Sequence, residues 1–306
     1  MIVVVCPGQG SQTPGFLQPW LSESRFSEQL ARYSEASGID LAAHGTTSDA
    51  DTIRDTAIAQ PLIVSAGLLA LSALFEHHRD GIAGIAGHSV GELTAAAGAG
   101  ILSDTDAVSL VTERGAAMAD AAALVATGMS AVVGADETEL LARLTELGLE
   151  PANFNGGGQI VVAGDLDALE RLKAEPPRGA RVIPLQVAGA FHTRFMAPAV
   201  ERLRAAAADK PAQDPKLAIW TNRDGSRVAS GTEFLDLLVG QVSSPVRWDA
   251  TMAAFARAGV TGIIELAPAG ALTGLAKRGL KGVPSVAVKT PDDLAAAFDL
   301  IDGNAA

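Results

Sequence analysis

Short, unbroken apolar runs recur along the chain and alternate with longer helical patterns. The runs are IVVVC (2–6), GIAGIAG (81–87), KLAIWT (216–221), GIIELA (262–267) and PSVAV (284–288). Strands of a parallel sheet have this composition because helices cover both of their faces. Helical patterns lie between the runs, for example at 60–78, 103–118 and 291–301, the last with Thr290 as N-cap and Pro291 at its first position. The alternation predicts an α/β fold with a mainly parallel sheet.

Between residues 127 and 188 the predicted elements become shorter and follow a different order. The patterns there are a strand (129–135), a helix (137–148), two short strands around a glycine-rich turn (152–165), a helix (166–174) and a closing strand (180–187). This βαββαβ order is typical of a ferredoxin-like unit. We therefore expect a small ferredoxin-like domain at 127–188, inserted into a large α/β domain formed by 1–126 and 189–306.

Composition limits the classes of function and the location. The chain has 306 residues and 48% hydrophobic content, enough to bury a large core. Its formal net charge of −12 argues against nucleic acid as a partner, since binding a polyanion depends on Lys and Arg. We expect its apolar runs to be broken before the ~20 residues that a membrane span requires. The single cysteine, Cys6, fits a reducing compartment, so we expect a cytoplasmic protein with no membrane partner.

The segment Gly87-His88-Ser89-Val90-Gly91 lies directly after a predicted strand and directly before a predicted helix. A G-x-S-x-G pattern in that context is typical of a nucleophile elbow, a tight turn in which the serine is strained and its neighbours must be small. The next backbone N–H, that of Val90, would then lie at a helix N-terminus and stabilise an oxyanion. The alternative is that Ser89 is only the N-cap of the helix.

A nucleophilic serine needs a base, and the chain has five histidines. His77 and His78 end a predicted helix, and His44 lies in a polar loop. His88 adjoins the serine, where we expect it to support the turn. His192, in VAGAFHTRFM (187–196), lies in a loop preceded by small residues and is the candidate base. The alternative for His192 is a buried histidine with satisfied hydrogen bonds.

Arg114 lies on an otherwise apolar stripe of the helix predicted after Ser103. Burying an unpaired charge is costly. The guanidinium therefore either pairs with an internal carboxylate or binds an anionic ligand through parallel hydrogen bonds. The local sequence leaves both alternatives open.

Five motifs resemble, in their order and approximate spacing, those of malonyl-CoA:acyl carrier protein transacylases. They are PGQGSQ (7–12), GHSVGE (87–92), TERGAAM (112–118), GAFHTRFM (189–196) and QVSSPVRW (241–248). The resemblance covers nearly the whole chain. It implies a hydrolase-like α/β domain with a ferredoxin-like insertion, in agreement with the predicted elements.

The resemblance also implies roles for individual residues. Ser89 would be the nucleophile and His192 its base, oriented by the main-chain carbonyl of Gln241. The backbone N–H groups of Gln9 and Val90 would form the oxyanion hole.

Two further residues would contact the acyl group. Arg114 would hold the malonyl carboxylate, and the Phe191 ring would occupy the space that an α-methyl group needs. Ser244 departs from the pattern, because many relatives have asparagine there.

The activity that the resemblance implies is transfer of malonyl from malonyl-CoA to the phosphopantetheine thiol of acyl carrier protein. It would proceed through a malonyl-serine intermediate in a ping-pong cycle, without metal or other cofactor, in fatty-acid or polyketide synthesis. The alternative is a serine esterase or thioesterase with the same elbow. A patatin-like lipase would instead need Asp224 as the partner of the serine. Candidates for docking an acidic carrier protein are the basic residues Arg194, Lys277, Arg278 and Lys281.

Overall fold

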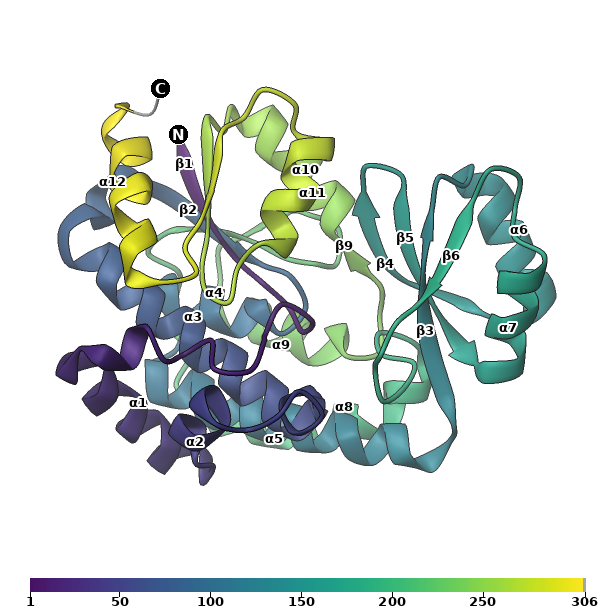
Figure 1. Ribbon diagram of the computed structural model, residues 1–306, viewed down its shortest axis with the longest axis horizontal. Coiled ribbons are helices and arrows are strands. Elements are labelled where there is room, and N and C mark those ends of the chain that lie inside the picture. The colour runs from purple at the N-terminus through teal and green to yellow at the C-terminus, as the bar shows by residue number, and fades with distance from the viewer. Residues whose placement is uncertain (305–306) are drawn as a thin grey trace.

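Two β-sheets lie side by side in the computed structural model, which describes residues 1–304 (Figure 1). The larger sheet has the order β11-β10-β1-β2-β7-β8. Its strands are β1 (Ile2–Cys6), β2 (Ile82–Gly87), β7 (Ala218–Trp220), β8 (Arg227–Val228), β10 (Gly262–Glu265) and β11 (Ser285–Ala287). Neighbouring strands pair in parallel except β8, which pairs antiparallel with β7. The predicted α/β class is confirmed.

Helices surround the larger sheet and, with it, form what we call the larger unit (Figure 1). They are α1 (Ser24–Ser37), α2 (Leu41–Thr46), α3 (Thr56–His78), α4 (Gly91–Gly98), α5 (Asp104–Leu124), α8 (Ala197–Ala208), α9 (Gly231–Gln241), α10 (Trp248–Ala258), α11 (Ala271–Gly279) and α12 (Leu294–Asp302). The predicted start at Thr290 is confirmed, since Thr290 and Asp293 form a capping box around Pro291 before α12.

Alternate residues of β1 point into two different cores. Val4 and Cys6 pack in the core that contains α3, α4 and α5, whereas Val3 and Val5 pack in the core that contains α10 and α11. All residues of β1 are buried. A strand covered on both faces has no polar side, which explains why its sequence is an unbroken apolar run.

Helix α3 is longer and more apolar than its sequence pattern indicated. The segment Thr56–Gly81 is long and apolar enough to span a membrane, with a mean hydropathy of 2.0 in its most apolar window, so the expectation that no apolar stretch reaches that length was wrong. It was wrong because Pro61 lies inside the helix instead of at its start. Within the protein, 83% of that window is buried, as in the core helix of a globular domain.

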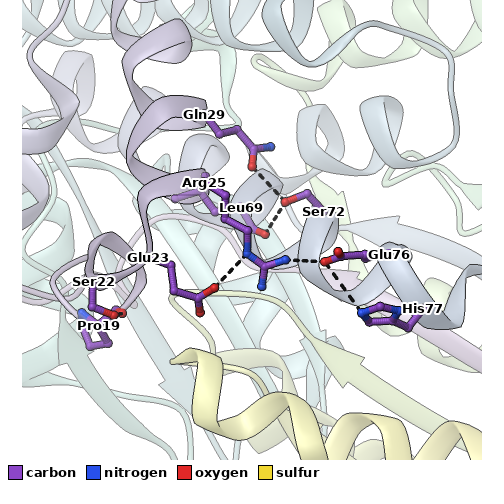
Figure 2. A network of polar contacts seen from close by, with 9 residues as sticks. All are labelled: Pro19, Ser22, Glu23, Arg25, Gln29, Leu69, Ser72, Glu76 and His77. Carbon is purple, nitrogen blue, oxygen red and sulfur yellow. Dashed lines mark hydrogen bonds and ion pairs between the residues drawn. The ribbon is translucent and has the colours of Figure 1, made fainter.

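Polar residues near the end of α3 are held by α1 and the segment before it. Ser72 Oγ donates to Gln29 Oε1 at 3.0 Å, and Glu76 pairs with Arg25, which also contacts Glu23 (Figure 2). These contacts place α1 against α3, where it covers part of the apolar surface of α3. Residues 59–71 of α3 are all buried, so neighbouring elements cover this part of the helix on every side.

The smaller sheet has the order β6-β3-β5-β4-β9. Its strands are β3 (Thr127–Val133), β4 (Glu150–Gly156), β5 (Gln159–Asp165), β6 (Arg181–Pro184) and β9 (Val246–Arg247), and its helices are α6 (Glu137–Leu147) and α7 (Leu166–Ala174). We call β3 to β6 with α6 and α7 the smaller unit. The strand β9 follows α9 in the larger unit and pairs in parallel with β4, with Asn153 opposite Val246 and Phe154 opposite Arg247. This strand was not predicted from the sequence.

The two faces of the smaller sheet have different surroundings. Val132, Phe154, Ile160 and Val162 pack with residues of α6 and α7 in a separate core. Because side chains alternate along a strand, the neighbouring residues point to the other face, toward the larger unit. The smaller sheet thereby contributes one wall of the cavity described below.

Candidate active site

Ser89 lies in the turn between β2 and α4 and has a φ of 54°, a left-handed conformation that side-chain-bearing residues rarely adopt. The glycines on either side fit where no larger residue would. A Cβ atom on Gly87 would lie 2.0 Å from the carbonyl carbon of Gly91, and one on Gly91 would lie 2.1 Å from the carbonyl oxygen of Cys6. The tight, strained turn predicted from G-x-S-x-G is present.

Asn222 supports this turn from the end of the neighbouring strand β7. The Ser89 N–H donates to Asn222 Oδ1 at 2.7 Å, and Asn222 Nδ2 donates to the carbonyl of Gly87 at 2.6 Å. Asn222 was not among the residues predicted from the sequence. The available signal was its place directly after a strand, because the carboxyl ends of parallel strands gather at one edge of a sheet.

His192 is within hydrogen-bond distance of the serine. Its Nε2 lies 2.7 Å from Ser89 Oγ, and its Nδ1 lies 2.9 Å from the main-chain oxygen of Gln241. A carbonyl only accepts hydrogen bonds, so Nδ1 carries the proton and Nε2 is free to accept the serine proton. Burial first, and then the charge of Arg114, lower the pKa of His192 to about 3. The imidazole is therefore neutral at physiological pH, as a general base must be.

Arg114 is 1% exposed and reaches the serine from α5. Its Nη1 donates to Gln60 Oε1 at 2.6 Å, and its Nη2 donates to Gln241 Oε1 at 2.7 Å and to Ser89 Oγ at 3.4 Å. All three acceptors are neutral. Burial lowers the pKa of Arg114 to about 10, so the guanidinium remains charged at neutral pH. Glu92 is the carboxylate whose charge acts on Arg114, and it connects to the guanidinium through Gln241 instead of bonding to it directly. The contacts of Arg114 are therefore compatible with an anionic ligand.

Glu92, in the first turn of α4, is a second site residue that was not predicted from the sequence. Its side chain is buried, and its Oε1 accepts the Asn222 N–H at 2.6 Å while its Oε2 accepts from Gln241 Nε2. Burial raises the pKa of Glu92, and the Asn222 N–H, the charge of Arg114 and the Gln241 amide oppose that rise. Both carboxyl oxygens accept hydrogen bonds, which is the arrangement of the ionised group. The position of this carboxylate beside Gln241 could not be read from the chain, because 149 residues separate the two.

The Ser89 hydroxyl opens onto a cavity of about 420 Å³ lined by both units. Gln9, Val90 and Phe191 line it near the serine, so the structure places these predicted site residues together with Ser89 and His192. Within residues 1–304, the N–H groups of Gln9 and Val90 donate to no protein acceptor. Two free N–H groups beside a nucleophile can stabilise an oxyanion.

The smaller sheet lines the opposite side of the cavity. Alternate residues of β4 and β5 face it, namely Asn153, Asn155, Gln159 and Val161. His88 Nε2 lies 2.9 Å from Asn155 Oδ1, which connects the turn at Ser89 to β4. His88 therefore supports the turn, as its sequence position suggested.

The remaining residues singled out in the sequence lie away from Ser89, His192 and Arg114, or at the edge of the cavity. Arg278 lines the cavity, and Lys277 is exposed beside it on α11. Arg194 is exposed and pairs with Glu150 of β4. Asp224 accepts from the Ser226 N–H and is not among the residues that line the cavity.

Lys281 and Ser244 are the last two of the residues singled out in the sequence. Lys281 is exposed just after α11. Ser244 is also exposed, and its N–H donates at 3.1 Å to the same Gln241 carbonyl that His192 contacts.

Within residues 1–304, no group of three or more His, Cys, Asp or Glu side chains is arranged to hold a metal ion.

Residues 3–292 match the acyl transferase domain. The chain is 53% identical over 298 residues to the malonyl CoA-acyl carrier protein transacylase of Mycobacterium tuberculosis, covering 96% of this chain and 98% of that protein. It superposes on the crystal structure of MCAT from Mycobacterium tuberculosis with a TM-score of 0.94 at 52% identity, covering 97% and 99% of the two chains. It also superposes, with a TM-score of 0.91 at 29% identity and 98% and 99% coverage, on the transacylase in a complex described as a type II PKS acyl-carrier protein with its malonyl-transacylase.

Proposed function

The chain belongs to the acyl transferase family, and on that premise we propose that it transfers malonyl from malonyl-CoA to the phosphopantetheine thiol of acyl carrier protein. One observation carries the proposal. Arg114 Nη2 lies 3.4 Å from Ser89 Oγ, and the guanidinium bonds only to neutral groups. A fixed guanidinium beside a nucleophile favours an acyl group that has its own carboxylate.

The first half-reaction forms an acyl-enzyme. His192 Nε2 accepts the proton of Ser89 as Oγ attacks the thioester carbonyl of malonyl-CoA. The N–H groups of Gln9 and Val90 stabilise the negative charge on the tetrahedral oxygen. When the intermediate collapses, the CoA sulfur leaves and takes the proton from His192. A malonyl ester of Ser89 remains.

The second half-reaction reverses these steps with a different thiol. The phosphopantetheine thiol of the carrier protein gives its proton to His192 as its sulfur attacks the ester carbonyl. The same two N–H groups stabilise the new oxyanion. Collapse of this intermediate releases Ser89 Oγ, which recovers its proton from His192, and the malonyl thioester leaves on the carrier. The cycle uses a nucleophile, a base and oxyanion donors, so we propose that it needs no metal or other cofactor.

We also propose that residues 127–188 form a ferredoxin-like domain inserted between 1–126 and 189–306. The chain order β3-α6-β4-β5-α7-β6 and the sheet order β6-β3-β5-β4 support this assignment. The larger unit, with its mainly parallel sheet, is then the hydrolase-like domain. We propose a cytoplasmic location, which fits a reaction between two soluble thiols and the single, buried cysteine.

The mass of the intact protein after brief exposure to malonyl-CoA tests the proposed function. We expect the wild type to gain one malonyl group and to lose it when carrier protein bearing phosphopantetheine is added, with malonyl appearing on the carrier. Ser89→Ala is the matched control and should gain nothing. Its melting curve should match the wild type, because alanine occupies the strained turn as serine does. Release of malonate to water, with none on the carrier, would favour the esterase alternative.

A further inference from the structure

Glu92 has no role in the chemistry above, yet it lies at the centre of the contacts around the site. Its carboxylate accepts from the Asn222 N–H with one oxygen and from Gln241 Nε2 with the other. Asn222 in turn accepts from the Ser89 N–H. A buried carboxylate with both oxygens bonded to site residues constrains those residues more than a solvated one would.

The side chain of Gln241 connects Glu92 to Arg114. Its Nε2 points to Glu92, and its Oε1 accepts from Arg114 Nη2 at 2.7 Å. A carboxylate accepts hydrogen bonds and a guanidinium only donates them. Only one orientation of the Gln241 amide therefore satisfies both neighbours. Nε2 also donates to the Ser89 carbonyl and to Asn222 Oδ1, both at 3.1 Å, and the Glu92 carboxylate is the nearest of the three acceptors that select this orientation.

We propose that Glu92 is a positioning residue that acts through the Gln241 amide to hold Arg114 in the orientation that binds the malonyl carboxylate. The inference rests on the proposed function, because it concerns how the enzyme distinguishes malonyl from acyl groups without a carboxylate. Glu92 itself contacts neither substrate nor the reacting oxygen. Its effect should therefore appear in the preference between substrates.

Glu92→Gln tests the proposal with almost no change in shape. An amide at position 92 must turn its NH₂ group toward either Gln241 Nε2 or the Asn222 N–H, and each choice opposes two donors in a buried site. We expect kcat/KM for malonyl-CoA to fall relative to acetyl-CoA by about tenfold or more. An equal fall for both substrates would overturn the proposal.

A double-mutant cycle separates action through Gln241 from a direct effect of the Glu92 charge on Arg114. Gln241→Met removes the amide and keeps the main-chain carbonyl that contacts His192. If Gln241 transmits the effect, Glu92→Gln should not change the malonyl preference further in the Gln241→Met background. If the effects of Glu92→Gln and Gln241→Met on the malonyl preference add, the proposal is contradicted. Additive effects would mean that the Glu92 charge acts on Arg114 directly, without the Gln241 amide.

Two further variants separate a folding defect from a change in substrate preference. Glu265→Gln is the matched control, because Glu265 is also buried and accepts two N–H groups, those of Leu272 and Thr273 on α11. It should lower the melting temperature without changing the malonyl preference.

If Glu92→Gln does not fold, Glu92→Asp tests the positioning role in its place, since it keeps the charge but withdraws the carboxylate from Gln241. A folded Glu92→Asp with the wild-type preference would overturn the proposal. Wild-type protein that forms no malonyl-enzyme would instead contradict the proposed function, so the two failures are distinguishable.

Discussion

His192 Nδ1 lies 2.9 Å from the main-chain oxygen of Gln241, in the place where many serine hydrolases have an aspartate side chain. The carbonyl orients the imidazole and fixes its tautomer as a carboxylate would, but it has no net charge. Without a negative partner, and beside the positive charge of Arg114, the imidazole has little tendency to take up a proton in the resting site. A base that is neutral at rest is suited to a reaction that begins with proton removal.

Replacing His192 with alanine should slow malonyl transfer by a factor on the order of 10² to 10⁴, the usual contribution of a positioned general base. Single-turnover formation of the acyl-enzyme is the measurement, since it isolates the step in which Ser89 loses its proton. A rate near that of the wild type would mean that His192 is structural. A melting curve of the variant is needed, because His192 is buried.

The pH profile of kcat/KM should show activity well below the ordinary histidine range. Burial and Arg114 lower the pKa of His192 to about 3, so the base is protonated, and activity lost, only in more acidic solution. The acid limb should therefore lie below pH 6.5, the usual pKa of histidine. Arg114→Ala should shift that limb to higher pH, because it removes a positive charge that disfavours the imidazolium. An acid limb centred near 6.5 would contradict the assignment of His192.

Arg114→Ala should weaken malonyl transfer by about 2 to 5 kcal/mol, the range for truncating one partner of a buried charge pair. Acetyl-CoA has no carboxylate to bind and should be used as well as before or better. Arg114→Lys should restore only part of the loss, since an ammonium group lacks the two-pronged geometry. The measurement is kcat/KM for both substrates on all three proteins. If both substrates lose the same factor, Arg114 does not recognise the carboxylate.

Phe191→Ser should increase the use of methylmalonyl-CoA relative to malonyl-CoA. Phe191 lines the cavity and precedes His192, so we expect its ring to limit the space beside the acyl group. A serine there would leave room for an α-methyl group, with some loss of packing and activity. The ratio of the two specificity constants is the measurement. An unchanged ratio would make Phe191 a core residue with no part in selectivity.

Charge reversal of Lys277 and Lys281 should weaken transfer to an acidic carrier protein more than transfer to free pantetheine. Both lysines are exposed near Arg278, which lines the cavity, whereas Arg194 is already paired with Glu150 and is a weaker candidate. Rising salt should act in the same selective way, because it screens exposed charges. Equal effects of salt and charge reversal on both acceptors would remove these residues from the docking surface.

Ser89, His192 and Arg114 could be singled out from the sequence because each carries a local signal, although their expected roles came from the resemblance of the five motifs. Ser89 has its glycines, His192 its loop of small residues, and Arg114 a charge on an apolar stripe. Asn222 and Glu92 have no such signal, since their roles come from contacts between residues 130 or more positions apart.

The helices and strands also divide into those that have a local sequence signal and those that do not. The parallel strands of the larger sheet could be predicted because each is an apolar run. The strand β9 could not be predicted, because two residues are too few to show a strand period. The length of α3 was also missed, because an internal proline resembles a helix start.

The pairing of β9 with β4 matters for any attempt to exchange the smaller unit between related enzymes. A graft of residues 127–188 would bring a new β4 but leave β9 behind in the host. The donor strand would then have to match Val246 in register and offer a surface for Arg247, whose guanidinium lies 4.7 Å from the Phe154 ring centre. Because Gln241 lies a few residues before β9, a poor match between β4 and β9 would disturb the Gln241 carbonyl that orients His192. Chimeras should therefore be cut so that β4 and residues 241–247 come from the same parent.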